Sequence, residues 1–186
     1  MDNLIRVYKE ALTDDQCEYL VSKFESHPEL HEKQVNADGQ TLTRLNLMGS
    51  RDSPFAEDLE LLSNVFMGAV RKYRDDIDIK PFQFPAKFAL EAIKIKRYLP
   101  SWHDSFPAHV DVNNLENCKR FLVMFIYLTD NQKGQTTLET KDDLFVSPCK
   151  KGSVLLFPPY WPWVHAGEKP VETSKYILGS YLHYAE

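Results

Sequence analysis

The run Ala108-His109-Val110-Asp111 places an imidazole and a carboxylate two residues apart. Side chains alternate across a β-strand, so both groups leave the same face if this run is extended. A second imidazole is available at His165, in the run Trp163-Val164-His165-Ala166-Gly167. Two imidazoles and one carboxylate on one side of a metal ion leave the opposite coordination positions open for reactants. We therefore predict a metal site formed by His109, Asp111 and His165.

This donor set leaves the metal and the reaction open. Non-heme Fe(II) oxygenases use two histidines and one carboxylate in this way, but the same ligands also suit zinc. A His-x-Asp pair occurs by chance in many proteins, so the choice depends on the rest of the sequence.

The composition is that of a soluble globular protein. With 186 residues, 43% of them hydrophobic and 26% charged, we expect one domain over residues 1–186. The net charge of −5 argues against a nucleic-acid partner. We find no apolar run of membrane-spanning length and no signal peptide, and the three scattered cysteines indicate reduced thiols. We therefore expect a cytoplasmic protein that does not associate with membranes.

Two amphipathic helices are expected in the N-terminal half. Thr13 and Gln16 have the spacing of a capping box, and the helix that follows should end before Pro28. Residues 27–40 are polar and are predicted to form a loop. A second helix is predicted to begin at Pro54. Its expected buried stripe contains Leu59, Leu62, Phe66, Ala69, Val70 and Tyr73.

The C-terminal half is predicted to be a series of short strands. Residues 88–99 alternate as one strand, with Lys94, Lys96 and Tyr98 on one face. Residues 121–129 are nearly all apolar, as expected for a strand that is covered on both faces. Further short strands separated by turn residues favour a barrel or sandwich. The predicted fold is α+β with a mainly β core, and the N-terminal helices support a barrel-like sheet.

The order of these motifs resembles the 2-oxoglutarate- and Fe(II)-dependent dioxygenases, in particular the prolyl 4-hydroxylase-like group. The resemblance covers nearly the whole chain. It is carried by Tyr98, His109-Val110-Asp111, Phe125-Ile126-Tyr127-Leu128, Gly134-Gln135-Thr136-Thr137-Leu138, Pro148–Pro158, His165 and Lys175-Tyr176.

The resemblance implies a double-stranded β-helix, that is, a jelly-roll or cupin-like barrel. It implies metal binding by His109, Asp111 and His165, and an Fe(II)- and 2-oxoglutarate-dependent hydroxylase that consumes O2, with ascorbate as a candidate additional cofactor. Lys175 stands where the family places the cation that pairs with the distal carboxylate of 2-oxoglutarate. Tyr127 matches a tyrosine that hydrogen-bonds this carboxylate, and Tyr98 matches one that lines the co-substrate site.

The primary substrate is less well defined. The resemblance implies a prolyl or other amino-acid residue in a peptide, or a free amino acid. The segment between Tyr98 and His109 is longer than usual in the group, which affects the mouth of the site. We predict a substrate rim formed by aromatic and polar residues near the ligands; for Trp163 the alternative is a core position at the barrel end. The predicted rim residues are Trp102, His103, Tyr160 and Trp163.

Two other functions remain compatible with the sequence. One is a cupin-like zinc or manganese enzyme of hydrolase or isomerase type, and the other is a catalytically inactive binding module on the same fold. Lys175 and Tyr127 favour the oxygenase because a zinc hydrolase has no need of a clamp for a dicarboxylate. The intact triad argues against an inactive module. The oligomeric state does not follow from the sequence.

Overall fold

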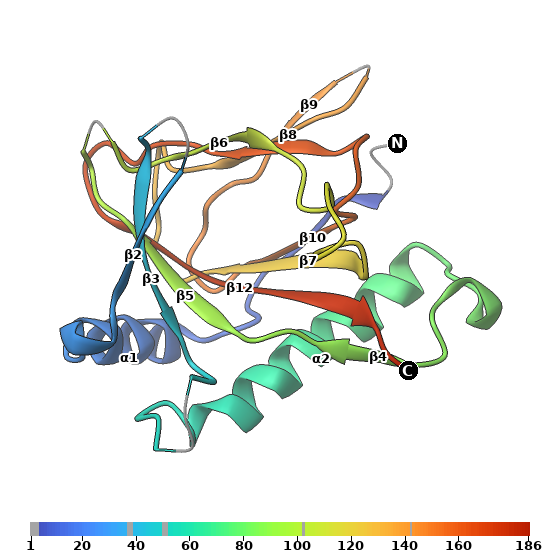
Figure 1. Cartoon of the computed structure of the whole chain (residues 1–186), viewed down its shortest axis with the longest axis horizontal. Coiled ribbons are helices and arrows are strands. Elements are labelled where there is room, and N and C mark those ends of the chain that lie inside the picture. The colour runs from blue at the N-terminus through green and yellow to red at the C-terminus, as the bar shows by residue number, and fades with distance from the viewer. Residues whose placement is uncertain (1–3, 37–38, 50–51, 102, 142) are drawn as a thin grey trace.

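The computed structural model describes residues 4–36, 39–49, 52–101, 103–141 and 143–186. Two antiparallel sheets face each other, and two helices cover the outer face of the larger sheet (Figure 1). The larger sheet has the order β1-β10-β7-β12-β5-β3-β2, with β4 paired to β12, and the smaller has the order β6-β11-β8-β9. Neither is closed into a barrel. No helix in these ranges is both long enough and apolar enough to cross a membrane.

The strands are short. Those of the larger sheet are β1 (Arg6–Tyr8), β2 (Glu32–Val35), β3 (Thr41–Asn46), β4 (Phe88–Leu90), β5 (Lys94–Tyr98), β7 (Arg120–Tyr127), β10 (Val154–Phe157) and β12 (Lys175–Tyr184). Those of the smaller sheet are β6 (Phe106–His109), β8 (Thr136–Glu139), β9 (Leu144–Val146) and β11 (Val164–Gly167).

The helices are α1 (Asp14–Glu25) and α2 (Asp58–Asp76). The predicted capping box is confirmed: the backbone N–H of Gln16 donates to Thr13 Oγ1 and that of Thr13 donates to Gln16 Oε1. Both helices pack their apolar faces on the larger sheet. The predicted stripe of α2 is buried from Leu62 to Tyr73, and Leu59 packs against its edge.

The apolar side chains form two cores, one on each face of the larger sheet. The alternate residues Leu122, Met124 and Ile126 of β7 point to the helices, whereas Phe125 and Tyr127 point to the space between the sheets. This explains the continuous apolar run predicted for the strand, because both of its faces are covered.

Three of the predicted boundaries were wrong. Residues 27–40 contain β2, an edge strand that pairs with β3 alone among the described strands and is largely exposed, so its sequence carries no apolar alternation. The strand predicted over 88–99 is broken into β4 and β5. Helix α2 begins at Asp58, after turns in which the fully buried Phe55 packs into the core. At Pro54 tertiary packing therefore overrides a local start signal.

Candidate metal centre

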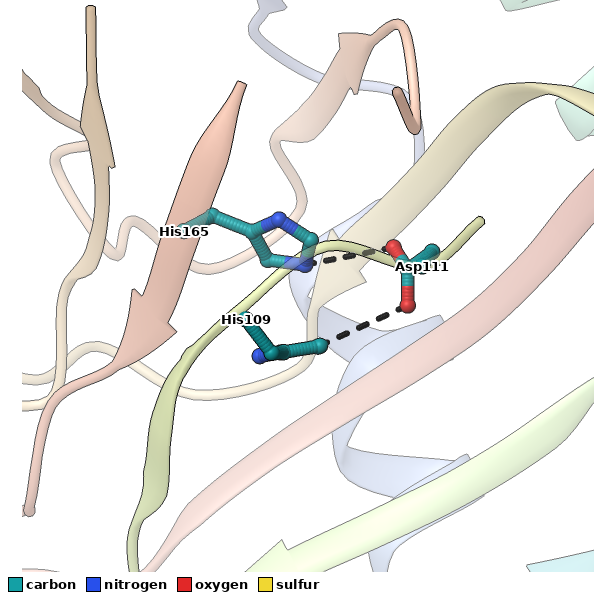
Figure 2. A group of neighbouring side chains, drawn as sticks. All are labelled: His109, Asp111 and His165. Atoms are coloured by element: carbon teal, nitrogen blue, oxygen red, sulfur yellow. Dashed lines mark ion pairs between the residues drawn. The ribbon is translucent and has the colours of Figure 1, made fainter. Parts of the chain in front are cut away.

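The smaller sheet brings the three predicted metal ligands together. His109 ends β6 and lies directly opposite His165 on the neighbouring strand β11. Asp111 follows two residues later, beyond the end of β6. All three side chains point toward one another (Figure 2), with His109 Nε2 3.5 Å from Asp111 Oδ1 and His165 Nε2 3.2 Å from Asp111 Oδ2. One potential ligand atom from each residue lies within 4.8 Å of the other two, so the group could hold one metal ion.

The hydrogen bonds around the two histidines fix which ring nitrogen of each carries a proton. Nδ1 of His109 lies 2.8 Å from the carbonyl oxygen of Pro107, and Nδ1 of His165 lies 3.2 Å from that of Trp163. A carbonyl oxygen only accepts, so each Nδ1 carries the proton and each Nε2 keeps a free lone pair.

The buried polar atoms of this cluster fit a metal ion. His165 Nε2 and Asp111 Oδ2 are buried without a hydrogen-bond partner in the described part of the chain. Leaving such atoms unpaired is costly, and coordination to a cation removes the cost. Burial alone would raise the pKa of Asp111, but the two neighbouring imidazoles, which donate hydrogen bonds and carry positive charge when they are protonated at Nε2 as well, outweigh burial and hold this pKa well below its usual range. The carboxylate is therefore ionised, as a metal ligand must be.

Tyr181 on β12 contacts this cluster and was not predicted as a site residue. Its hydroxyl donates to Asp111 Oδ1 over 3.0 Å. The Arg120 guanidinium lies 4.0 Å from the centre of the Tyr181 ring and makes a bidentate ion pair with Glu91. The sequence did contain a signal: Tyr181 lies six residues after Lys175, an even number, so both leave the same face of a strand.

A buried lysine lies in the same cavity as the metal ligands. Lys175 is 1% exposed, and its burial lowers its pKa to about 8. Its Nζ lies 5.2 Å from the centre of the Tyr98 ring and 6.0 Å from that of Tyr127. The Tyr127 hydroxyl donates to Thr136 Oγ1 over 2.8 Å. Thr136 borders the cavity, whereas Tyr127 lies behind it.

The cavity has a volume of about 290 Å³. It contains five of the predicted site residues in its wall: Tyr98, His109, Asp111, His165 and Lys175. The wall also includes residues that the sequence analysis did not select, among them Lys94, Lys96, Arg120, Thr136 and Tyr181.

The predicted rim residues do not border this cavity where the structure describes them. His103 is exposed, Tyr160 packs against the core between the sheets, and Trp163 is 8% exposed within that core. The alternative of a core position is therefore the one that fits Trp163. Closeness in sequence to a ligand does not place a side chain in the wall: Trp163 comes before the first residue of β11, so the alternation that orients His165 does not extend to it. Trp102 lies outside the described residues.

Comparison with solved structures gives the fold. A viral collagen prolyl hydroxylase from Paramecium bursaria Chlorella virus-1, solved with 2-oxoglutarate, aligns with a TM-score of 0.66 and 15% identity over 98% of this chain and 97% of that one. A prolyl hydroxylase from Trichoplax adhaerens, in complex with a peptide of hypoxia-inducible factor, aligns with a TM-score of 0.74 and 14% identity over 97% of this chain and 84% of that one. The chain has the fold of the 2-oxoglutarate/Fe(II) oxygenases. The predicted double-stranded β-helix is thus confirmed, with sheets that stay open.

The oxygenase fold also serves other chemistry. A non-heme α-ketoglutarate-dependent carbocyclase from nogalamycin biosynthesis aligns with a TM-score of 0.70 and 13% identity over 98% of this chain and 80% of that one. No family model and no curated protein sequence matches the chain. At these identities the likeness establishes the oxygenase fold, and the reaction must be argued from the residues of the site.

Proposed function

We propose that the chain is an Fe(II)- and 2-oxoglutarate-dependent dioxygenase that hydroxylates an unactivated C–H bond. The observation that carries the proposal is that one cavity contains both the open-sided group of His109, Asp111 and His165 and the buried cation Lys175. A dicarboxylate that chelates a metal through one end needs a fixed cation at the other. A zinc hydrolase or isomerase needs only the first of these features.

Each residue has a distinct role in this proposal. His109, Asp111 and His165 would hold Fe(II), which, when bound, activates O2 together with 2-oxoglutarate. Lys175 binds the distal carboxylate, and Thr136 lines the same cavity. The resemblance gives Tyr127 a hydrogen bond to the same carboxylate, and in the unliganded chain its hydroxyl donates to Thr136 Oγ1. Tyr98 packs beside Lys175 and limits the access of water to that end.

The substrate in this proposal is a prolyl or other amino-acid residue of a peptide, or a free amino acid. The Trichoplax hydroxylase was solved with a peptide, which supports the first alternative. The carbocyclase comes from nogalamycin biosynthesis, so the fold leaves the second alternative open. Dependence on ascorbate rests on the resemblance alone, and turnover measured with and without ascorbate tests it.

The test is metal binding followed by 2-oxoglutarate turnover. The purified chain should bind Fe(II) with a stoichiometry near one, and should release succinate from 2-oxoglutarate in air but not under anaerobic conditions. His165→Ala should lose both properties. His103→Ala, which removes an exposed histidine outside the cavity wall, is the matched control and should retain both. Full iron retention in His165→Ala would contradict the ligand assignment.

The same measurements address the alternatives. A metalloenzyme of another type would prefer zinc or manganese and would leave 2-oxoglutarate unchanged. An inactive binding module would bind 2-oxoglutarate without producing succinate.

A further inference from the structure

Basic side chains gather at the part of the cavity that lies away from Lys175. They come from three strands of the larger sheet: Arg44 from β3, Lys94 and Lys96 from β5, and Arg120 from β7. Among the described residues that line the cavity, Asp111 is the single acidic one. The chain as a whole carries a net charge of −5, so this concentration of positive charge is local.

The two arginines already have counter-charges. Arg44 Nε lies 2.8 Å from a carboxylate oxygen of Glu32. Arg120 donates two hydrogen bonds, of 2.7 Å and 2.8 Å, to Glu91. Neither Lys94 nor Lys96 makes an ion pair within the ranges that the structure describes. Lys96 Nζ instead lies over two aromatic rings, 5.5 Å from the centre of Phe125 and 5.8 Å from that of Phe106.

The strand register places these lysines at successive distances from the co-substrate cation. Tyr98 pairs with Lys175 across β5 and β12, Lys96 pairs with Ile177, and Lys94 pairs with Gly179. Each step of two residues is about 6.6 Å along a strand. Lys96 therefore lies one step, and Lys94 two steps, from the end of the cavity that holds Lys175.

Lys96 extends over Gly179 of β12 toward Phe125 of β7. A Cβ at Gly179 would lie 4.0 Å from Lys96 Cε and 3.3 Å from the Phe125 ring, so the missing side chain leaves the space that these two occupy. Burial lowers the pKa of Lys96 to about 8, and attraction to the Asp111 carboxylate partly offsets this effect. The ammonium group lies over Phe106 and Phe125, whose rings lie 4.4 Å from the His109 ring and 6.5 Å from the His165 ring, so it borders the cavity close to the predicted metal ligands.

The bound co-substrate does not provide a counter-charge for these lysines. In the proposed function, one end of 2-oxoglutarate binds the metal and Lys175 neutralises the other. A partly buried cation without a partner is costly, so Lys94 and Lys96 favour a further anion. We propose that Lys96, assisted by Lys94, binds a carboxylate of the primary substrate. This inference rests on the proposed function and selects a small carboxylic acid, such as a free amino acid, over an internal residue of a peptide.

The experiment measures binding and does not depend on turnover. The full chain, loaded with Mn(II) and saturated with N-oxalylglycine in place of 2-oxoglutarate, is titrated calorimetrically with L-proline, L-leucine and L-glutamine, and with their amides. At least one acid should bind about tenfold more tightly than its amide, the value of one charge-assisted hydrogen bond. Inorganic phosphate is included as a competing oxyanion.

Substitution of Lys96 tests whether this lysine causes the preference for the acid over the amide. In Lys96→Met the ratio between acid and amide should fall to near one, and Lys96→Gln repeats the test if the first variant does not fold. Lys33→Met makes the same change on the exposed face of β2 and should keep the preference. Equal affinity for acid and amide, no binding of any acid, a preference that survives in Lys96→Met, or tighter binding of phosphate would each overturn the proposal.

The binding of N-oxalylglycine separates this proposal from the proposed function. It is measured first, on the wild-type chain and on each variant. If the wild-type chain does not bind it, the proposed function fails and this inference fails with it. If the wild-type chain binds it but Lys96→Met weakens it as much as Lys175→Met does, Lys96 belongs to the co-substrate site, and only the present inference is overturned.

Discussion

Lys175 and Tyr98 lie directly opposite each other on the antiparallel strands β12 and β5, with the lysine Nζ 5.2 Å from the centre of the tyrosine ring. This pair forms one end of the cavity. From it, every second residue of each strand faces the metal centre, so Ile177, Gly179 and Tyr181 follow Lys175 along the wall. The register of the two strands thus fixes where the buried cation lies along the wall relative to Tyr181, whose hydroxyl contacts Asp111.

Replacement of Lys175 by methionine should weaken binding of N-oxalylglycine to the Mn(II)-loaded chain. The loss of a buried charge-assisted partner costs on the order of 2–5 kcal/mol. The free energy of unfolding of the unliganded chain should not fall, because an unpaired buried charge is replaced by an apolar side chain of similar length. Calorimetry and urea unfolding measure the two effects. Unchanged affinity for N-oxalylglycine would show that another cation holds the carboxylate.

The affinity for N-oxalylglycine should depend on pH through Lys175. Burial lowers the pKa of this lysine to about 8, so the unliganded site loses its positive charge as the pH rises through this value. The dissociation constant should be nearly constant below pH 8 and should rise above it, approaching about tenfold per pH unit if only the ammonium form binds. Lys175→Arg, whose guanidinium stays protonated, should not show this rise. A flat profile in the wild-type chain would contradict the assignment.

Removal of the Tyr181 hydroxyl should loosen the metal site. Tyr181→Phe deletes the hydrogen bond to Asp111 Oδ1 and leaves the aromatic ring over Arg120. Metal affinity, measured by competition with a chelating dye, should fall about 10-fold or more, as for other residues that orient a metal ligand. The control is Tyr73→Phe, which loses a 2.7 Å hydrogen bond to the Leu4 carbonyl away from the cavity. Equal metal affinity in both variants would exclude the orienting role.

Gly152 should tolerate alanine much less well than Gly39. Both have a positive φ, +75° and +77°, but a Cβ at Gly152 would lie 2.4 Å from the Leu12 carbonyl oxygen, whereas one at Gly39 meets nothing within 4 Å. Gly39→Ala should therefore lower the free energy of unfolding only by the cost of holding alanine in the left-handed conformation, about 1–2 kcal/mol. Gly152→Ala should lower the free energy of unfolding by about 1–3 kcal/mol more, because the new methyl group also clashes with the Leu12 carbonyl. Urea unfolding of the two variants compares them, and equal losses would show that the chain around Leu12 adjusts freely.

The sequence by itself predicted the candidate donor set and determined much of the local structure. His109 and Asp111 were recognisable because the period of two in an extended chain is a local property. The capping box at Thr13 and the two-sided burial of residues 121–129 follow from equally local rules. The face of β5 that carries Lys94, Lys96 and Tyr98 was also predicted correctly, because alternation survives even though the longer strand is broken before Lys94.

Only the tertiary structure decided which side chains share the cavity. Arg44, Lys96 and Tyr181 lie far apart in the chain and meet there because β3, β5 and β12 are neighbours in one sheet. Conversely, Trp163 lies two residues before a metal ligand and yet packs into the core. A sequence pattern gives the face of a strand on which a residue lies. The pairing of distant strands, however, is set by burial over the whole molecule, so no local pattern encodes which other side chains that face contacts.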